Sequence, residues 1–253
     1  MPELPEAEVV AQQIRAHLLG AQIKDCWVGR ADIVREGLPT LPWYLGACLE
    51  RVERYGKSVA LGFQKENELR YVVAELGMTG LLLFRATQTK YPQHVHVRLS
   101  FTGGRESELR YWNPRRFGRL SLLDQAGLDR YRARRFGVDP LTVPRDEFIS
   151  LMEARRGRLK PLLMHQQVIA GIGNIYANEM LFRAKLHPNR EASRLRKAMI
   201  VRLYDTMQTV LREAIACGGS SVKDFFAPDG TEGHYKQHHL VYGKEGQPCP
   251  NRC

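Results

Sequence analysis

The chain has 253 residues, 43% of them hydrophobic, and a net charge of +11. No apolar run approaches the ~20 residues of a membrane span, and the N-terminus lacks the basic and then apolar order of a signal peptide, so we expect a cytoplasmic protein without a membrane partner. The positive charge favours a polyanionic partner, with nucleic acid ahead of an acidic membrane surface, although a basic face that is merely solvated gives the same net charge.

The chain begins Met-Pro-Glu-Leu-Pro-Glu, and this stretch allows two interpretations. Removal of the initiator methionine would leave Pro2 with a free secondary amine, which titrates near pKa ~8 and can attack an electrophilic carbon to form an iminium. Glu3 would lie beside this amine, and Glu6 just inside the helix that follows. The alternative is a helix that opens at Pro5 and carries acidic residues in its first turn, as the helix dipole favours.

Apolar residues then recur at helical spacing as far as Gly20, a natural helix end. From residue 22 to about 123, short β-branched and aromatic runs alternate with glycine turns, which predicts an antiparallel sandwich or barrel. Helical periodicity replaces this pattern from about residue 128. The helices expected there cover residues 130–136, 145–155, 159–168, 174–182 and 193–217.

Three loops carry residues that core packing does not explain. Lys57 follows a glycine turn and precedes an apolar strand, so its ammonium group could project from a sheet edge toward a cleft, although a turn lysine is usually only solvated. Met78 lies at the tip of a turn, and a later loop presents Arg115, Arg116 and Phe117. Two arginines and an aromatic ring on a tight loop suit a base edge, a phosphate and an inserted ring, although an exposed basic turn is the alternative.

A fourth loop interrupts an apolar helix with two glycines, after which Asn174 restarts the helix. Asparagine is a strong N-cap residue, and free N–H groups at the positive end of a helix make a phosphate site. Basic neighbours such as Lys160 favour that interpretation. We therefore predict a phosphate contact at Asn174.

Six segments resemble the motifs of bacterial formamidopyrimidine-DNA glycosylase, in that family's order and spacing and across essentially the whole chain. They are Pro2-Glu3-Leu4-Pro5-Glu6, Tyr55-Gly56-Lys57, Leu76-Gly77-Met78, Pro114-Arg115-Arg116-Phe117-Gly118, Gly171-Ile-Gly173-Asn174-Ile-Tyr176 and Gly219-Ser220-Ser221-Val-Lys223-Asp224-Phe225. Because several independent motifs match in the same order, coincidence is negligible. The functional interpretations of these residues are therefore favoured over the purely structural ones.

The resemblance implies a bifunctional DNA glycosylase and abasic-site lyase of base excision repair. Pro2 would attack C1′ of the deoxyribose of an extruded oxidised purine, and the resulting Schiff base would allow β- and δ-eliminations that cut the strand. Glu3 would protonate the opening sugar ring and relay protons, Glu6 would hold the geometry and charge of the site, and Lys57 would bind the backbone at the lesion.

The resemblance also implies contacts with double-stranded DNA. Phosphate contacts are expected from His94, Arg116 and Asn174, while Lys223 and the loop over residues 219–233 would fold over the extruded base. Met78, Arg115 and Phe117 would fill the vacated space, with Arg115 reading the orphaned cytosine and Phe117 wedged into the stack. This trio favours 8-oxoguanine and formamidopyrimidines opposite cytosine over the oxidised pyrimidines that related endonuclease VIII enzymes prefer.

We therefore predict an α+β fold with two domains and a monomeric protein. An N-terminal catalytic domain over residues 1–127 would combine the first helix with an antiparallel β-sandwich. A helical domain with a helix-two-turns-helix motif would follow over residues 128–223. Residues 224–253 would hold the rest of the lesion loop and the start of a C-terminal zinc hairpin.

The cysteines complicate the zinc prediction. The family usually has two Cys-x-x-Cys pairs that bind one zinc ion, whereas here Cys249 and Cys253 are separated by three residues, after which the sequence stops. Two thiolates are half of a tetrahedral site. His234, His238 and His239 could complete it, or the sequence is shorter than the natural chain, or the protein is a truncated version.

Two other functions stay open at this point. A catalytically silent binder of damaged DNA would follow if Met1 is retained, because Pro2 would then be an amide without a nucleophilic lone pair. A glycosylase that prefers oxidised pyrimidines is the second alternative. Trapping with borohydride distinguishes the first from the enzyme, and a comparison of substrates distinguishes the second.

Overall fold

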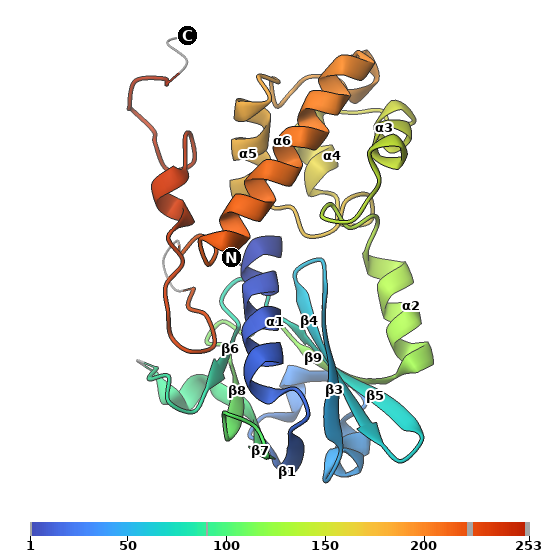
Figure 1. Cartoon of the computed structure of the whole chain (residues 1–253), viewed down its shortest axis with the longest axis vertical. Coiled ribbons are helices and arrows are strands. Elements are labelled where there is room, and N and C mark those ends of the chain that lie inside the picture. Colours follow the sequence, from blue (N-terminus) through green and yellow to red (C-terminus); the bar gives the residue numbers. More distant parts are fainter. Residues whose placement is uncertain (1, 90, 222–224, 251–253) are drawn as a thin grey trace.

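The computed structural model describes residues 2–89, 91–221 and 225–250, and the first half of this range forms a nine-stranded sheet in the order β2-β9-β5-β4-β3-β1-β7-β8-β6 (Figure 1). All neighbouring strands are antiparallel except the short pair β2 and β9, which is parallel. The strands are β1 (Gln22–Val28), β2 (Val34–Glu36), β3 (Cys48–Tyr55), β4 (Ser58–Lys65), β5 (Glu68–Glu75), β6 (Leu81–Phe84), β7 (Val95–Thr102), β8 (Glu108–Trp112) and β9 (Leu120–Asp124).

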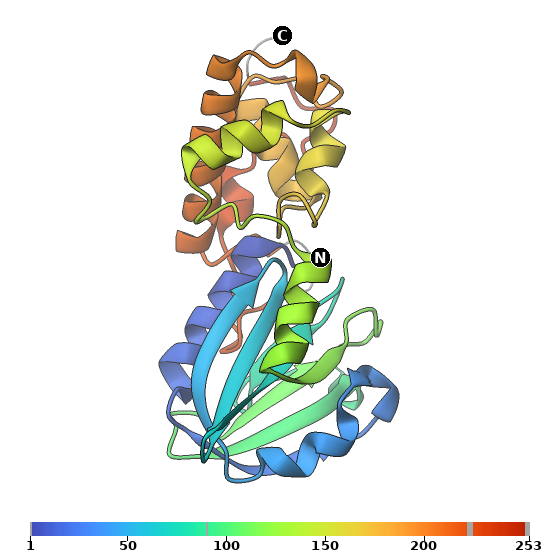
Figure 2. The ribbon, with the colours of Figure 1, turned by 90° about the vertical axis from the view of Figure 1, so that its right-hand side faces the viewer.

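The sheet folds over on itself, because β1 and β3 share only the pair Gln22 and Cys48 at their junction. Figure 2 shows the strands on either side of this junction crossing as two layers. Apolar side chains from both layers fill the space between them, and the rings of Phe63 and Phe101 stack across it with centroids 6.4 Å apart. The predicted β-sandwich is therefore confirmed.

Helix α1 (Leu4–Leu18) joins the two halves of the molecule. Val10, Ile14 and Leu18 recur at helical spacing and lie in the core of the sandwich, whereas Leu4 lies in the core of the helical half. Figure 1 shows α1 running along the sheet with its first turn next to α6 (Lys197–Ala216). The N-terminus is thereby placed where the two halves meet.

Helix α2 (Gln125–Arg135) begins five residues earlier than the sequence pattern predicted. The carboxylate of Asp124 accepts a hydrogen bond of 2.7 Å from the Gly127 N–H and so caps the helix. Leu128 and Tyr131 pack on the outer face of the sheet. The helix therefore covers the sandwich before the chain enters the helical half.

The helical half contains α3 (Arg145–Glu153), α4 (Leu159–Met164), α5 (Asn174–Arg183) and α6, with the predicted helix-two-turns-helix motif between α4 and α5. The predicted continuation of α4 to residue 168 was wrong. The side chain of Gln166 donates to the carbonyls of Met164 and Ile172 and accepts from the Gly171 N–H, so it holds the chain in two tight turns. Short 3-10 helices lie at Ala31–Ile33, Leu38–Tyr44, Pro92–His94, Ala192–Arg194 and Tyr235–His238.

The tail over residues 225–250 runs back along the helical half. Its first part is joined to the end of α6 by a single β-bridge between Ser220 and His234. Within residues 225–250 no paired strands follow this bridge, so the structure does not show the predicted zinc hairpin. Across the described ranges, no helix is long and apolar enough to cross a membrane.

Candidate active site

Glu3 precedes α1, and its carboxylate lies at the N-terminus of α5. Its oxygens accept hydrogen bonds from the backbone N–H groups of Gly173 at 2.8 Å, Ile175 at 2.9 Å and Tyr176 at 3.4 Å. The side chain is only 2% exposed, and this burial raises the pKa of Glu3 to about 7, against the opposing effect of Lys57. A buried carboxyl group that carries a proton near neutral pH can act as a general acid there.

Glu6 lies one turn further along α1 and is also buried. Its carboxylate accepts hydrogen bonds from the Glu3 N–H at 2.8 Å, the Ser220 N–H at 2.7 Å and the Tyr176 hydroxyl at 2.6 Å. Burial raises the pKa of Glu6 as well. Because all three donors are fixed by the fold, Glu6 ties the start of α1 to α5 and to the end of α6.

Two glycines allow this close approach. A Cβ atom on Gly173 would lie 2.4 Å from Cδ of Glu3, and one on Gly219 would lie 2.9 Å from Oε1 of Glu6. Gly219 also has a φ of +84°, in the left-handed region that side chains disfavour. The glycines of two quoted motifs therefore enclose the two carboxylates.

Pro2 and Lys57 border this pair. Pro2 is buried directly before Glu3, and Lys57 lies in the two-residue turn between β3 and β4. Burial lowers the pKa of Lys57, and the negative charges of Glu3 and Glu6 oppose this effect. The four residues predicted as catalytic are thus brought together.

The residues that we predict to fill the vacated space lie on two loops that a hydrogen bond connects. The amide side chain of Asn113 is fully buried, and it accepts from the Thr79 hydroxyl at 3.4 Å and from the Arg116 N–H at 3.0 Å. It thereby links the turn that carries Met78 to the loop over residues 113–118. Met78 is 42% exposed and Phe117 is 57% exposed, so both apolar side chains face solvent.

Arg115 completes the trio, with its guanidinium group 4.8 Å from the centroid of the Phe117 ring. Arg116 is exposed at a positive φ of 54°, and its guanidinium group lies 3.7 Å from the carboxylate of Asp32. The loop therefore presents two cations and an aromatic ring outward, as the sequence predicted.

The remaining predicted DNA contacts are spread over both halves. His94 is half-buried in the 3-10 helix before β7 and packs edge-on against Trp112 at 6.2 Å, while Lys160 is half-buried on α4. Lys223 lies outside the described residues. Whether these side chains bind DNA stays a prediction.

Asn174 needs a correction. It is the first residue of α5 and its side chain is exposed, but the N-cap is Gly173 and Asn174 makes no capping hydrogen bond. The N–H groups predicted to be free for a phosphate are those that the Glu3 carboxylate accepts from. A phosphate contact at Asn174 is therefore limited to its exposed side chain and its own N–H group, because the neighbouring N–H groups donate to Glu3.

Sequence reasoning assigned no role to Tyr176 or Ser220, although both lie in the quoted motifs. It also treated His239 only as a candidate zinc ligand, whereas the structure buries this ring with Nε2 2.9 Å from the Ser220 hydroxyl. No local pattern links these residues, because they lie in α5, after α6 and in the tail. Their proximity to Glu6 arises only on folding.

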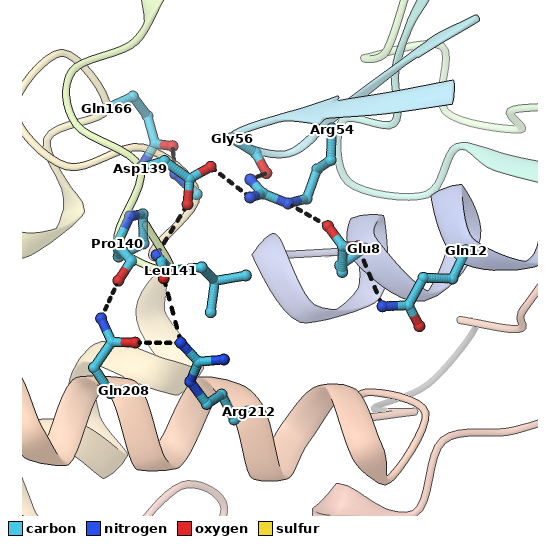
Figure 3. Close-up of polar contacts among 11 residues, drawn as sticks. Glu8, Gln12, Arg54, Gly56, Asp139, Pro140, Leu141, Gln166, Gln208 and Arg212 are labelled. Carbon is cyan, nitrogen blue, oxygen red and sulfur yellow. Dashed lines mark hydrogen bonds and ion pairs between the residues drawn. The ribbon is translucent and has the colours of Figure 1, made fainter. Parts of the chain in front are cut away.

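A second polar cluster, centred on Arg54, also went unnoticed (Figure 3). Nε of Arg54 binds the carboxylate of Glu8 at 2.9 Å, and its other end binds the carboxylate of Asp139 and the carbonyl of Gly56. On α6, Gln208 and Arg212 donate to carbonyls of residues 140 and 141, directly after Asp139. The cluster therefore joins α1, β3, the connection between the two halves and α6.

The residues present do not fit a structural zinc site. Within the ranges that the structure describes, no three His, Cys, Asp or Glu side chains cluster as metal ligands. Cys249 is half-buried in the tail, Cys253 lies outside the described residues, and His239 is already bonded to Ser220. One zinc ion per chain therefore stays an expectation from the resemblance, and the described residues do not provide a site for it.

Comparisons with known proteins agree with this geometry. The model of the formamidopyrimidine-DNA glycosylase N-terminal domain matches residues 1–120, and that of the H2TH domain of the same enzymes matches residues 136–226. The chain is 36% identical over 260 residues to formamidopyrimidine-DNA glycosylase of Stenotrophomonas maltophilia, covering 99% of this chain and 92% of that protein. It is also 36% identical over 253 residues to the same enzyme of Solibacter usitatus, covering 99% and 91%.

Solved structures give the same result. A crystal structure of the Fpg protein from Thermus thermophilus superposes with a TM-score of 0.84 at 34% identity, covering 98% of this chain and 90% of that one. A complex of Lactococcus lactis Fpg with DNA that contains an abasic site gives a TM-score of 0.87 at 27% identity, covering 99% and 91%.

Proposed function

Given that this chain belongs to the formamidopyrimidine-DNA glycosylase family of DNA repair enzymes, we propose that it is a bifunctional DNA glycosylase and abasic-site lyase. Its substrates are 8-oxoguanine and formamidopyrimidines opposite cytosine in double-stranded DNA, on which it acts as a monomer. The observation that carries this proposal is the burial of the carboxylates of Glu3, which follows Pro2 in the chain, and of Glu6, which accepts the Glu3 N–H.

The first step is attack by the Pro2 nitrogen on C1′ of the damaged nucleotide. The nitrogen lone pair forms the new bond, and the C1′–base bond breaks with its electrons leaving on the base, which takes up the proton that the Pro2 nitrogen gives up. The ring oxygen O4′ then departs from C1′ as the iminium forms, and it takes a proton from Glu3. A Glu3 pKa of about 7 suits this role, because about half of the carboxyl groups carry a proton at pH 7.

The second stage cuts the strand. The iminium acidifies the C2′ hydrogens, so that loss of one proton expels the 3′ phosphate, and a second elimination expels the 5′ phosphate. The carboxylate of Glu3, which directly follows Pro2 in the chain, can take the C2′ proton once it has given up its own. Three backbone N–H donors keep it in place between the two proton transfers.

Lys57 and the surrounding charge support binding of the DNA backbone. Its ammonium group faces the two buried carboxylates from the tip of a β-turn, and the chain has a net charge of +11. His94, Arg116 and Asn174 supply further phosphate contacts, and Lys160 and Lys223 add two further positive charges for binding the DNA backbone.

The exposed trio accounts for the choice of substrate. An extruded base leaves a gap opposite its partner, and Met78 and Phe117 are apolar side chains whose exposure costs free energy until they enter the stack. Arg115 carries donors that suit the O2 and N3 acceptors of cytosine. We therefore propose that the trio favours cytosine as the opposite base.

Borohydride trapping tests the enzymatic proposal. Protein whose mature terminus is confirmed as Pro2 by intact mass is incubated with a duplex containing 8-oxoguanine opposite cytosine, then reduced. We expect a covalent protein–DNA product, and we expect Pro2→Gly to lower its rate of formation far more than it lowers lesion affinity. Tight binding without any trapped product from Pro2-terminated protein would instead establish a catalytically silent binder of damaged DNA.

A comparison of two duplexes tests the substrate proposal. Excision of 8-oxoguanine should exceed that of 5-hydroxycytosine under the same conditions, because the trio matches the oxidised-purine branch. A clear preference for the pyrimidine would overturn this part while leaving the chemistry at Pro2 intact.

A further inference from the structure

Four buried side chains form one continuous line of polar atoms from the active site to the tail. The Tyr176 hydroxyl donates to Oε1 of Glu6 at 2.6 Å and lies 3.3 Å from Oγ of Ser220, which lies 2.9 Å from Nε2 of His239. All four side chains belong to residues that are at most 4% exposed. No water is needed to bridge any of the three contacts.

The far end of this line is firmly held. The carboxylate of Glu179 on α5 accepts the N–H groups of Leu240, Val241 and Tyr242, directly after His239. The charged groups facing the imidazole are Glu179, Lys236 and Lys244, and the rings of Tyr235 and Tyr242 pack at 5.7 and 5.6 Å. His239 is therefore held in place by the segment that follows it, which is fixed to α5. It lies outside the six motifs that resemble the family.

The hydrogen bonds of His239 determine which groups in this line donate and which accept. Burial lowers the pKa of His239, so its imidazole is neutral at physiological pH, and its hydrogen bond to the backbone of Tyr242 opposes that shift, as an accepting carbonyl does. With Nδ1 donating to Tyr242, Nε2 accepts from the Ser220 hydroxyl. The Ser220 proton is then committed to His239 and the Tyr176 proton to Glu6, so the 3.3 Å contact holds the two hydroxyl oxygens side by side without a shared proton.

Ser220 reaches Glu6 a second time through its backbone. Its N–H donates to Oε1 of Glu6 at 2.7 Å, and its β-bridge to His234 closes the base of the loop over residues 221–233. Glu6 in turn accepts the N–H of Glu3, the residue that follows Pro2. A side chain that fixes Ser220 therefore affects Glu6 in two ways, through the side chain of Ser220 and through its backbone N–H. Because Glu6 accepts the N–H of Glu3, it also affects the backbone beside Pro2.

We infer that His239 is a positioning residue of the active centre, which acts through Ser220 and Tyr176 to hold Glu6 and the Glu3 backbone in place. The tail segment around residue 239 is then part of the catalytic architecture rather than only a DNA-binding appendage. This inference rests on the function proposed above. A packing role alone would be filled equally well by a leucine of similar volume.

The test compares His239→Leu, His239→Gln, Ser220→Ala and the double variant Ser220→Ala/His239→Leu with wild type. Three quantities are measured: the single-turnover trapping rate on the 8-oxoguanine duplex, the Kd for that duplex and the Tm. The control is His238→Leu, which changes the exposed neighbouring ring. It should leave the trapping rate unchanged.

We expect His239→Leu to lower the trapping rate about tenfold or more, because the buried Ser220 hydroxyl loses its acceptor and turns to donate to the Tyr176 oxygen, which shifts the two residues whose donors hold Glu6, while the Kd stays within about twofold. Ser220→Ala should lose a similar factor, and the double variant should lose no more than either single variant, since both interrupt one line. His239→Gln should recover much of the rate, because its amide can accept from Ser220.

The inference is overturned if His239→Leu traps at the wild-type rate, if rate and affinity fall together, or if the losses multiply in the double variant. If His239→Leu does not fold, His239→Gln and Ser220→Ala still decide it, because the inference requires Ser220→Ala to be slow and His239→Gln to be close to wild type. Absence of trapping by the wild type is a different outcome, since it refutes the proposed function itself.

Discussion

The first turns of α1 carry two sets of acidic side chains, which the protein treats in opposite ways. Glu8 binds Arg54, which also binds Asp139, so each carboxylate has a cationic partner and some access to solvent. Glu3 and Glu6 are almost fully buried, form no ion pair with any described cation and are held instead by backbone N–H groups and a tyrosine hydroxyl. Both clusters join the same two halves of the molecule.

The difference indicates which cluster serves stability and which serves chemistry. An ion pair neutralises its carboxylates and fixes the geometry, but it leaves no proton to transfer near neutral pH. Burial raises the pKa of both Glu3 and Glu6, because their hydrogen-bond donors are neutral and only partly offset the loss of water. Ionisation of either group therefore costs folding free energy. A cost of this kind is typical of functional sites, where perturbed acids concentrate.

The substitution with the largest expected effect tests directly whether the two clusters have different roles. Glu3→Gln should lower the trapping rate on the 8-oxoguanine duplex about 100-fold or more, because the amide cannot protonate O4′, while lesion affinity changes little. Single-turnover trapping and a binding titration measure the two quantities. Equal losses of rate and affinity would mean that Glu3 only holds the DNA-binding geometry, and the distinction between the clusters would fail.

Arg54→Met should show the opposite behaviour. Removing the guanidinium group, which is 6% exposed, leaves the carboxylates of Glu8 and Asp139 unpaired, and we expect unfolding in urea to require about 2 kcal/mol less. The trapping rate of the folded protein should stay close to that of wild type. The matched control is Arg30→Met, whose ion pair with Asp32 is about half exposed, and which should leave the unfolding midpoint unchanged.

A large part of this arrangement follows from local sequence. The change from β-branched runs to helical periodicity predicted the two halves. Glu3 and Glu6 were predicted as site residues because they lie near Pro2 in the sequence. The contacts that give these residues their properties join positions far apart, with Glu3 and Gly173 separated by 170 residues and Arg54 and Asp139 by 85. Sequence patterns report periodicity and turn chemistry, and neither encodes which buried polar groups meet.

The prediction at Asn174 illustrates the same point. A glycine pair followed by asparagine is a sound local signal for an open helix N-terminus. In the folded protein the Glu3 carboxylate binds that end of α5, and no feature of residues 168–179 predicts this contact. The local signal located the start of the helix correctly, but the N-cap is Gly173, and the phosphate contact at Asn174 stays a prediction.

The two loops that carry Met78 and Phe117 differ from both clusters, because these side chains are exposed rather than buried. Phe117→Ala should leave the Tm unchanged, because the ring is 57% exposed in the free protein, but it should weaken binding of the lesion duplex about tenfold. Affinity for an undamaged duplex should change less. If the variant instead unfolds at lower temperature with unchanged lesion affinity, Phe117 belongs with Arg54 as a structural residue.

The smallest expected effect is the dependence of the trapping rate on pH, which tests the elevated pKa of Glu3. Trapping needs Pro2 as the free amine and Glu3 with its proton, so with pKa values of about 8 and about 7 the rate should peak near pH 7.5. It should fall about fivefold from pH 8 to 9 as Glu3 loses its proton, and about fivefold from pH 7 to 6 as Pro2 gains one. The residual rate of Glu3→Gln should keep the acidic limb and lose the alkaline one. An alkaline limb that survives in Glu3→Gln would assign the transferred proton to another group, and Lys57, whose pKa burial lowers, would be the first to examine.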